Sequence, residues 1–343
     1  MMAHPITEQV ARTDRHTCFY LGCGAADAPL VILLHGWPEL SVSWRHQLHA
    51  LAALGFRAIA PDMRGYGRSS IYPDVGDYSV EASVDDMLGL LDALGHERAV
   101  WVGHDWGTPV AWSLASHHPE RCHGVAGLCV PYLPDGFATQ TLIPLVDRVI
   151  YPEDRFPAGQ WDYMLYYEAH FDVVCELFDR DPVRTMRAMM RGANRTRVGK
   201  PGPLSTVRRD GGWFGGQGVV PDLPLDTRVL DEPWLHEYAS ALARNGFFAP
   251  NAWYLNGRCN LDYAKRACNG GRLDLPVLFL HADSDLTCQT IGSRLADPMR
   301  AACTNLTEYT VNSGHWMVQE QPTQVNAGLA RWLSEQLPGL WPV

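Results

Sequence analysis

One stretch constrains the whole chain: residues 99–108 run from an apolar segment into a sharp turn and then into the start of a helix. The apolar part predicts a buried strand, and the turn is Gly103-His104-Asp105-Trp106-Gly107. Its two glycines permit a tight, strained backbone that lifts the central side chain clear of a sheet. The pattern therefore predicts a strand–turn–helix elbow with Asp105 at its tip.

An aspartate at the tip of the elbow determines which chemistry is available. A carboxylate is ionised at neutral pH. It can displace a leaving group from a saturated carbon, which forms an alkyl ester on the enzyme. The alternative is an ordinary strand-to-helix turn in which Asp105 only caps the helix. The rest of the chain decides between these two interpretations.

Apolar runs of strand length alternate with helical patterns on both sides of the elbow. The sequence predicts further strands at 16–24, 30–34, 57–61, 124–130, 276–281 and 305–311. It predicts helices at 79–94 (with Ser79 as N-cap), 291–302 and 322–336. This alternation is typical of an α/β protein with a doubly wound, mostly parallel sheet. Active sites in such sheets lie at the carboxyl ends of the strands, where the Asp105 turn falls.

The middle of the chain has a different texture. Helical patterns cover 161–178, 182–191, 232–244 and 251–267. Residues 194–224 are rich in Gly, Pro and Arg and are too long for a simple connection, which predicts a mobile or functional loop. We therefore expect an α/β core formed by residues 1–132 and 269–343, with residues 133–268 inserted as a helical cap.

A carboxylate nucleophile needs a partner that activates water. In proteins with this elbow, the order along the chain is nucleophile, acid, histidine. The sequence supplies Asp105, then Asp283 or Asp285 after one strand, and His315 after the next. The histidine would take a proton from water, and the acid would orient the imidazole and stabilise its charged form. Each residue alone is equally typical of a turn or loop, but together they favour catalysis.

The segment His35-Gly36-Trp37-Pro38 follows another predicted strand. A loop at that position can aim the backbone N–H of Trp37 at the elbow. With the N–H of Trp106 it would form an oxyanion hole for the ester carbonyl of Asp105. A proline-stiffened turn without catalytic function is the alternative.

Several segments together resemble the epoxide hydrolases of the α/β-hydrolase fold. They are His35-Gly-Trp-Pro-Glu39, Asp62-Met-Arg-Gly-Tyr-Gly-Arg-Ser69, the Asp105 elbow, residues 282–285 and residues 314–326. The resemblance extends over residues 29–337 and is weakest in 133–157 and 195–226. It selects Asp285 over Asp283 as the acid.

The resemblance also implies two cap tyrosines that hydrogen-bond the epoxide oxygen, and it points to Tyr163 and Tyr254. An alkoxide is a poor leaving group, and a phenol with a pKa of about 10 can donate a proton while remaining neutral itself at pH 7. Without the family, both residues would be interpreted as packed aromatics, and Tyr166 and Tyr167 are rivals for the first position. Glu39 matches a residue that in relatives helps to place the hydrolytic water, although a surface carboxylate is an alternative.

These observations predict an epoxide hydrolase that forms vicinal diols through an Asp105 ester, with no cofactor and no metal. A haloalkane dehalogenase would use the same nucleophile, but such enzymes usually carry Asn where this chain has Trp37. A non-catalytic binding protein of the same fold is the other alternative, and such proteins commonly lose a member of the triad.

Composition limits the partners. The formal net charge of −10 argues against nucleic acid and anionic membranes. No apolar run approaches the roughly 20 residues of a membrane span. The nine cysteines show no CxxC or zinc-like spacing, which predicts thiols in a reducing compartment, the cytoplasm. A small epoxide is the expected partner, and a homodimer is left open.

Overall fold

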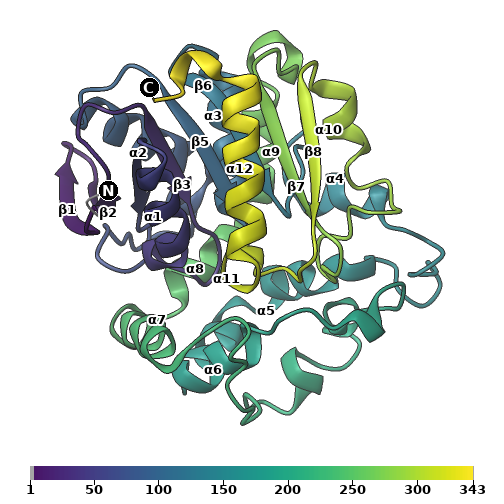
Figure 1. The fold of residues 1–343 in the computed structure, drawn as a ribbon. Coiled ribbons are helices and arrows are strands. Elements are labelled where there is room, and N and C mark those ends of the chain that lie inside the picture. Colours follow the sequence, from purple (N-terminus) through teal and green to yellow (C-terminus); the bar gives the residue numbers. More distant parts are fainter. Residues whose placement is uncertain (1–3, 343) are drawn as a thin grey trace.

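The computed structural model describes residues 4–342 and is organised around an eight-stranded sheet (Figure 1). The strand order is β1-β2-β4-β3-β5-β6-β7-β8. All neighbours from β4 to β8 pair in parallel, whereas β1–β2 and β2–β4 are antiparallel. The strands are β1 Thr7–Arg12, β2 Thr17–Cys23, β3 Leu30–Leu34, β4 Arg57–Pro61, β5 Ala99–His104, β6 Cys122–Leu128, β7 Val277–Ala282 and β8 Leu306–Val311. The predicted α/β class and mostly parallel sheet are confirmed.

Helices of the core cover both faces of the sheet. Helix α1 packs against α12 and β4, whereas α2 packs against α3, which lies on β5 and β6. Their bounds are α1 Arg45–Ala53, α2 Val80–Ala93, α3 Gly107–His117, α10 Asp297–Ala302, α11 Met317–Glu320 and α12 Pro322–Gln336. The apolar stripe of α12, formed by Val325, Leu329, Trp332 and Leu333, is buried at helical spacing. The predicted N-cap of α2 is confirmed, because the Ser79 side chain accepts a hydrogen bond from the Ala82 N–H at 3.2 Å.

The chain leaves the core after β6 and returns to it before β7. The intervening helices α5, α6 and α7 lie together beside one end of the sheet (Figure 1). The helices of this region are α4 Thr139–Leu142, α5 Asp162–Asp179, α6 Pro182–Met189, α7 Glu232–Asn245, α8 Phe248–Ala252 and α9 Gly257–Ala264.

Two predicted helices were wrong in extent. The helix expected at 291–302 forms only as α10, because Gly292 has a φ of +71° and Pro298 lacks the N–H that a longer helix would use. The helix expected at 251–267 is interrupted between α8 and α9. There the Asn256 amide donates to the Ala252 carbonyl at 2.9 Å and takes the place of a backbone donor.

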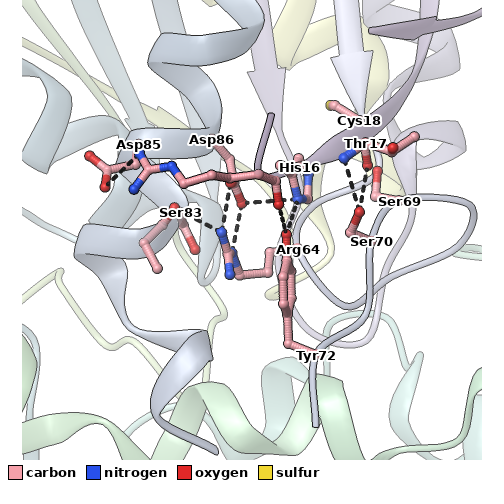
Figure 2. Close-up of polar contacts among 12 residues, drawn as sticks. His16, Thr17, Cys18, Arg64, Ser69, Ser70, Tyr72, Ser83, Asp85 and Asp86 are labelled. Atoms are coloured by element: carbon pink, nitrogen blue, oxygen red, sulfur yellow. Dashed lines mark hydrogen bonds and ion pairs between the residues drawn. The ribbon is translucent and has the colours of Figure 1, made fainter. Parts of the chain in front are cut away.

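A buried polar cluster connects the turn between β1 and β2 with helix α2 (Figure 2). Arg64 donates two hydrogen bonds of 2.7 Å to the carboxylate of Asp86 on α2. The His16 Nδ1 atom lies 3.0 Å from the Tyr72 hydroxyl and 3.5 Å from Asp86. The Arg64 guanidinium also lies 4.2 Å from the centre of the Tyr72 ring. We call these four residues the amino-terminal cluster.

Among residues 4–342, no helix has both the length and the apolar character needed to cross a membrane.

Candidate active site

The elbow forms as predicted between β5 and α3. Asp105 adopts a φ of +48°, in the left-handed region that side chains rarely occupy. A Cβ on Gly103 would lie 2.5 Å from the Gly107 carbonyl oxygen, and one on Gly107 would lie 2.2 Å from that of Leu34. The two glycines are therefore required by close approach of the backbone, and the strained residue between them projects its carboxylate from the sheet.

The three predicted triad residues converge at the carboxyl ends of the strands. The His315 Nδ1 atom lies 2.8 Å from Asp285 Oδ2, and His315 Nε2 lies 3.3 Å from Asp105 Oδ2. Asp285 is fully buried and accepts further hydrogen bonds from the N–H groups of Thr287 and Cys288. These contacts hold the acid in a fixed orientation behind the imidazole.

Asp283, the other candidate acid, faces elsewhere. Its carboxylate lies 3.5 Å from a guanidinium nitrogen of Arg195 in the 194–224 loop. The geometry therefore brings Asp285, rather than Asp283, to His315.

The surroundings of His315 and Asp285 favour the charged form of both side chains. Burial alone would lower the pKa of His315, but the charge of Asp285 and the hydrogen bonds to Asp105 and Asp285 raise it well above its usual value. Burial would likewise raise the pKa of Asp285, yet the His315 charge and the hydrogen bonds that it accepts lower it. While Asp105 is ionised, His315 therefore holds its proton strongly.

One of the two predicted oxyanion donors contacts the nucleophile. The Trp37 N–H donates to Asp105 Oδ1 at 2.6 Å. A Cβ on Gly36 would lie 2.3 Å from the same oxygen, which explains why glycine precedes Trp37. Among the hydrogen bonds of the described residues, none joins the Trp106 N–H to Asp105. The role of Trp106 as the second oxyanion donor therefore stays a prediction.

Glu39 is not the surface carboxylate considered as an alternative, because it is completely buried. Its Oε2 atom lies 2.9 Å from His104 Nδ1, and Gln319 donates to its other oxygen. The second ring nitrogen of His104 lies 2.8 Å from the backbone carbonyl oxygen of His315. Glu39 therefore reaches His315 through His104, and it does not line the cavity that opens in front of Asp105.

Both ring nitrogens of His104 face hydrogen-bond acceptors, so both carry protons when Glu39 is ionised. Burial lowers the pKa of His104, but the Glu39 charge raises it to about 10. Burial raises the pKa of Glu39, but the His104 charge and hydrogen bond lower it to about 2. A buried ion pair thus stands directly behind the nucleophile. His104 was not predicted as a functional residue, although its position in a buried strand was a usable signal, since a buried imidazole needs hydrogen-bond partners.

A cavity of about 570 Å³ opens in front of Asp105 and is also lined by Tyr163 and Tyr254. The two phenol rings lie 5.7 Å apart, and the Tyr254 ring stacks on Tyr167 at 4.5 Å. Burial raises the pKa of both Tyr163 and Tyr254 well above 10, which keeps each hydroxyl protonated. Tyr166 packs on His170 instead and does not line this cavity.

The 194–224 loop supplies much of the cavity wall, although none of its residues was predicted to belong to the site. Its cavity-lining side chains include Leu204, Val207, Trp213, Phe214 and Leu223. These residues belong to no motif, and only the folded loop brings them to the site.

Two groups of side chains present ligand atoms within 4.8 Å of one another: His104, Cys129 and His315, and Asp285, Cys288 and His315. Both groups include His315, so a cation held there would compete with the proton on that imidazole.

Comparison with known proteins identifies the family. A family model described as alpha/beta hydrolase fold matches residues 29–162. Epoxide hydrolase A of Mycobacterium tuberculosis is 34% identical over 336 residues, which cover 96% of this chain and 97% of that protein. The chain belongs to the epoxide hydrolases of the α/β-hydrolase fold. Epoxide hydrolase B of the same species is 32% identical, with 92% of each chain covered.

Solved structures agree with this assignment. The crystal structure of epoxide hydrolase A from Mycobacterium thermoresistibile matches this epoxide hydrolase with a TM-score of 0.79 at 32% identity, covering 96% of this chain and 99% of that one. An epoxide hydrolase from an endophytic Streptomyces matches with a TM-score of 0.77 at 30% identity, covering 96% and 95%. The predicted family and enzyme class are confirmed, and the substrate is a small molecule.

Proposed function

We propose that this epoxide hydrolase opens epoxides to vicinal diols through an ester on Asp105. The observation that carries the proposal is the convergence of Asp105, His315 and Asp285 at one cavity that two phenols also line. Asp105 Oδ1 accepts a hydrogen bond from the Trp37 N–H, which leaves Oδ2 to attack an epoxide carbon. The C–O bond of the oxirane breaks as the ester bond forms.

Tyr163 and Tyr254 are the proposed acids for this step. Their hydroxyls would hold the oxirane oxygen on the side opposite Asp105 and donate a proton to the developing alkoxide. Their raised pKa values mean that both are protonated in the resting enzyme. If both donate, Tyr163→Phe and Tyr254→Phe each reduce ester formation about 10²-fold, and the double variant abolishes it. A fully active double variant would overturn this assignment.

His315 is the proposed base for hydrolysis of the ester. Ester formation removes the negative charge of Asp105, which is one of the groups that raise the pKa of His315. The imidazole therefore becomes easier to deprotonate when a water must be activated. Water attacks the ester carbonyl, and the oxyanion develops on Oδ1 beside the Trp37 N–H, with Trp106 as the second proposed donor.

Glu39 is proposed to act as a positioning residue through His104, rather than on the water directly. Its contact runs from carboxylate to imidazole to the His315 carbonyl, which holds the backbone of the base. We also propose residues 133–268 as the cap and residues 1–132 and 269–343 as the core, because the cavity is lined from both parts. A cytoplasmic location is supported by the nine free thiols, and the homodimer stays a prediction that sedimentation equilibrium would test.

The haloalkane dehalogenase alternative is disfavoured by one contact. The indole N–H of Trp37, a donor that could serve a halide at this position, already donates to Asn251 Oδ1 at 2.9 Å. The non-catalytic alternative is disfavoured because all three triad members are present and in contact.

Turnover of styrene oxide and 1-bromobutane by the wild type and by Asp105→Ala tests the proposal, with diol and bromide as products. We expect diol without bromide, and a loss of about 10³-fold or more in the variant. Bromide without diol would replace the proposal with a dehalogenase. An active Asp105→Ala variant would exclude Asp105 as the nucleophile.

A further inference from the structure

The proposed base stands on a segment that side chains hold in place. His315 follows β8, which is the last strand in the order of the sheet and pairs with β7 on one side. The His315 carbonyl oxygen lies 2.8 Å from His104 Nε2. Just before the imidazole, the Gly314 N–H donates to Glu320 Oε2 at 2.9 Å. The backbone is therefore held by one side chain on each side of His315.

The Glu320 carboxylate also binds the proposed cap. The Ala193 N–H, in the segment that follows α6, lies 3.1 Å from each of the two carboxylate oxygens. A Cβ on Gly314 would lie 2.9 Å from the Ala193 nitrogen, so glycine at this position permits the close approach. A second contact lies nearby, because the Trp316 indole N–H donates to the Met189 carbonyl at 3.1 Å. The cap segment 189–193 thus contacts the backbone on both sides of the imidazole.

The same cap segment is also held from its other side. The Gly192 N–H donates to Asp226 Oδ2 at 3.0 Å, and the Arg228 guanidinium donates to the Ala193 carbonyl at 3.0 Å. Arg228 and Asp226 form an ion pair of 2.6 Å with each other. Gly192 and Ala193 both line the cavity in front of the nucleophile. Glu320 therefore connects a fixed part of the cavity wall with the backbone that carries the base.

Ester formation removes one of the contacts that hold the imidazole. In the free enzyme, His315 Nε2 lies 3.3 Å from Asp105 Oδ2, and opposite charges on the two groups attract. The ester of Asp105 is neutral, so this attraction is lost when His315 must face the attacking water. The position of the imidazole then depends on Asp285 and on the backbone that Glu320 holds. A displacement of about 1 Å is enough to slow a reaction about 10²-fold.

We propose that Glu320 is a positioning residue for hydrolysis of the ester, because it joins the cap to the backbone that carries His315. This role rests on the ester mechanism proposed above. Glu320 does not line the cavity, so it acts through Gly314 and not on the reacting atoms. It keeps the imidazole directed at the water while Asp105 is esterified. Ester formation does not depend on it, since the charge of Asp105 still holds His315 in that step.

Rapid-quench single turnovers of styrene oxide, with enzyme in excess, measure the two steps separately. Mass spectrometry follows the ester on Asp105, and chromatography follows the diol. Glu320→Ala removes both acceptor oxygens and should slow ester hydrolysis about tenfold, while the rate of ester formation stays within about twofold of the wild type. Glu320→Gln keeps one acceptor oxygen and the shape of the side chain, so hydrolysis should slow less. Partial unfolding would lower the amount of ester formed but not the rate of its hydrolysis.

Gln324→Ala is the matched control. Gln324 Oε1 accepts a hydrogen bond from the Asn312 N–H at 3.1 Å, in the same segment after β8, and the hydrogen bonds of Gln324 within residues 4–342 stay in the core. This variant should hydrolyse the ester at the wild-type rate.

A wild-type hydrolysis rate in Glu320→Ala would overturn the proposal. Equal slowing of the two steps, or equal effects of Glu320→Ala and Gln324→Ala, would overturn it as well. In each of these cases, an ester on Asp105 of the wild type would leave the proposed function intact. If the wild type forms diol without that ester, the proposed mechanism fails, and the role of Glu320 fails with it.

Discussion

Two regions of this molecule bury a histidine against a carboxylate, and the two histidines respond in opposite ways. At the active site, His315 lies 2.8 Å from Asp285, and its pKa is raised well above the usual value. In the amino-terminal cluster, His16 lies 3.5 Å from Asp86, and burial together with the nearby Arg64 charge lowers its pKa to about 4. The presence of a neighbouring carboxylate therefore does not by itself predict the charge of a buried histidine.

The difference lies in what else the carboxylate binds. Asp86 receives two hydrogen bonds of 2.7 Å from Arg64, so its charge is already neutralised before His16 is considered. Asp285 accepts hydrogen bonds from backbone N–H groups, which carry no net charge, and its negative charge remains available to His315. The guanidinium of Arg64 thus accounts for the difference: a His–Asp pair without such a neighbour forms the proposed base at the candidate active site, whereas the pair beside Arg64 stays structural.

The largest effect is expected from Asp285→Asn. The amide cannot balance an imidazolium and favours the wrong tautomer, so ester hydrolysis should slow by about 10³–10⁴-fold, the loss typical of a triad acid. Ester formation should continue, so the covalent adduct on Asp105 should accumulate in single-turnover experiments and be visible by mass spectrometry. Asp283→Asn, which removes a carboxylate paired with Arg195, is the control and should leave the rate unchanged. A wild-type hydrolysis rate in Asp285→Asn would contradict the comparison.

The next effect, in the amino-terminal cluster, concerns stability and not rate. Asp86→Asn leaves the Arg64 guanidinium buried without an anion, and arginine cannot lose its proton to escape that cost. The free energy of unfolding should fall by about 3–5 kcal/mol in urea titrations. Asp85→Asn removes an exposed pair with Arg15 at 3.6 Å and should cost less than about 1 kcal/mol.

The rate of epoxide hydrolysis by Asp86→Asn distinguishes the amino-terminal cluster from the candidate active site. Asp86 does not line the active-site cavity, so the folded fraction of Asp86→Asn should hydrolyse epoxides at the wild-type rate. A loss of rate without loss of stability would instead place the amino-terminal cluster in the catalytic machinery.

Glu39→Gln tests the buried Glu39–His104 ion pair and should have an effect of intermediate size. Unlike Arg64, His104 can lose its proton when its carboxylate partner is removed. Without the carboxylate, His104 can lose a proton and still keep one hydrogen bond, so the loss should be smaller, about 1–3 kcal/mol. The pKa of His104, about 10, lies above its ordinary value, so the wild type gains stability that is full below about pH 6.5. That stability is lost as pH rises through 10. Unfolding measured from pH 6.5 to 10 should therefore show a flatter profile in Glu39→Gln.

The central strands and two of the three triad residues could be predicted from the sequence for one physical reason. Parallel strands buried on both faces appear as continuous apolar runs, and Asp105 and Asp285 each follow such a run. His315 follows β8, an edge strand of mixed polarity, and was predicted from the order of the three residues along the chain. The strand β1 was not predicted, because most of its residues are polar and exposed and it is stabilised by pairing with β2 rather than by burial.

The cavity walls and the second buried histidine depend on tertiary contacts. Glu39 and His104 are 65 positions apart, and no local pattern shows that they form an ion pair. Trp213 and Arg197 reach the cavity through a loop without regular periodicity, so their sequence neighbours contain no information about what they face. Motifs predicted where the proposed reacting groups lie, whereas only the folded structure shows which side chains line the rest of the cavity.

The smallest effect at neutral pH is expected from His16→Leu. His16 Nε2 is buried and has no hydrogen-bond partner among the described residues, so replacing the neutral ring with leucine should change stability by less than about 1 kcal/mol at pH 7.5. Leucine keeps an apolar side chain in contact with Tyr72 and Arg64 but cannot titrate.

The wild type and His16→Leu should differ in stability at acidic pH. The pKa of His16 is about 4 when folded, below its ordinary value of about 6.5, so the unfolded chain binds a proton first as pH falls. The wild type should therefore lose up to about 3 kcal/mol between pH 6.5 and 4, at about 1.4 kcal/mol per pKa unit. Asp86 opposes this trend, because burial raises its pKa to about 6 even beside Arg64, but Asp86 titrates in both proteins. His16→Leu should thus unfold with a shallower dependence on pH over this range, and parallel pH profiles would mean that His16 shares the charge of Asp86 after all, as His315 shares that of Asp285.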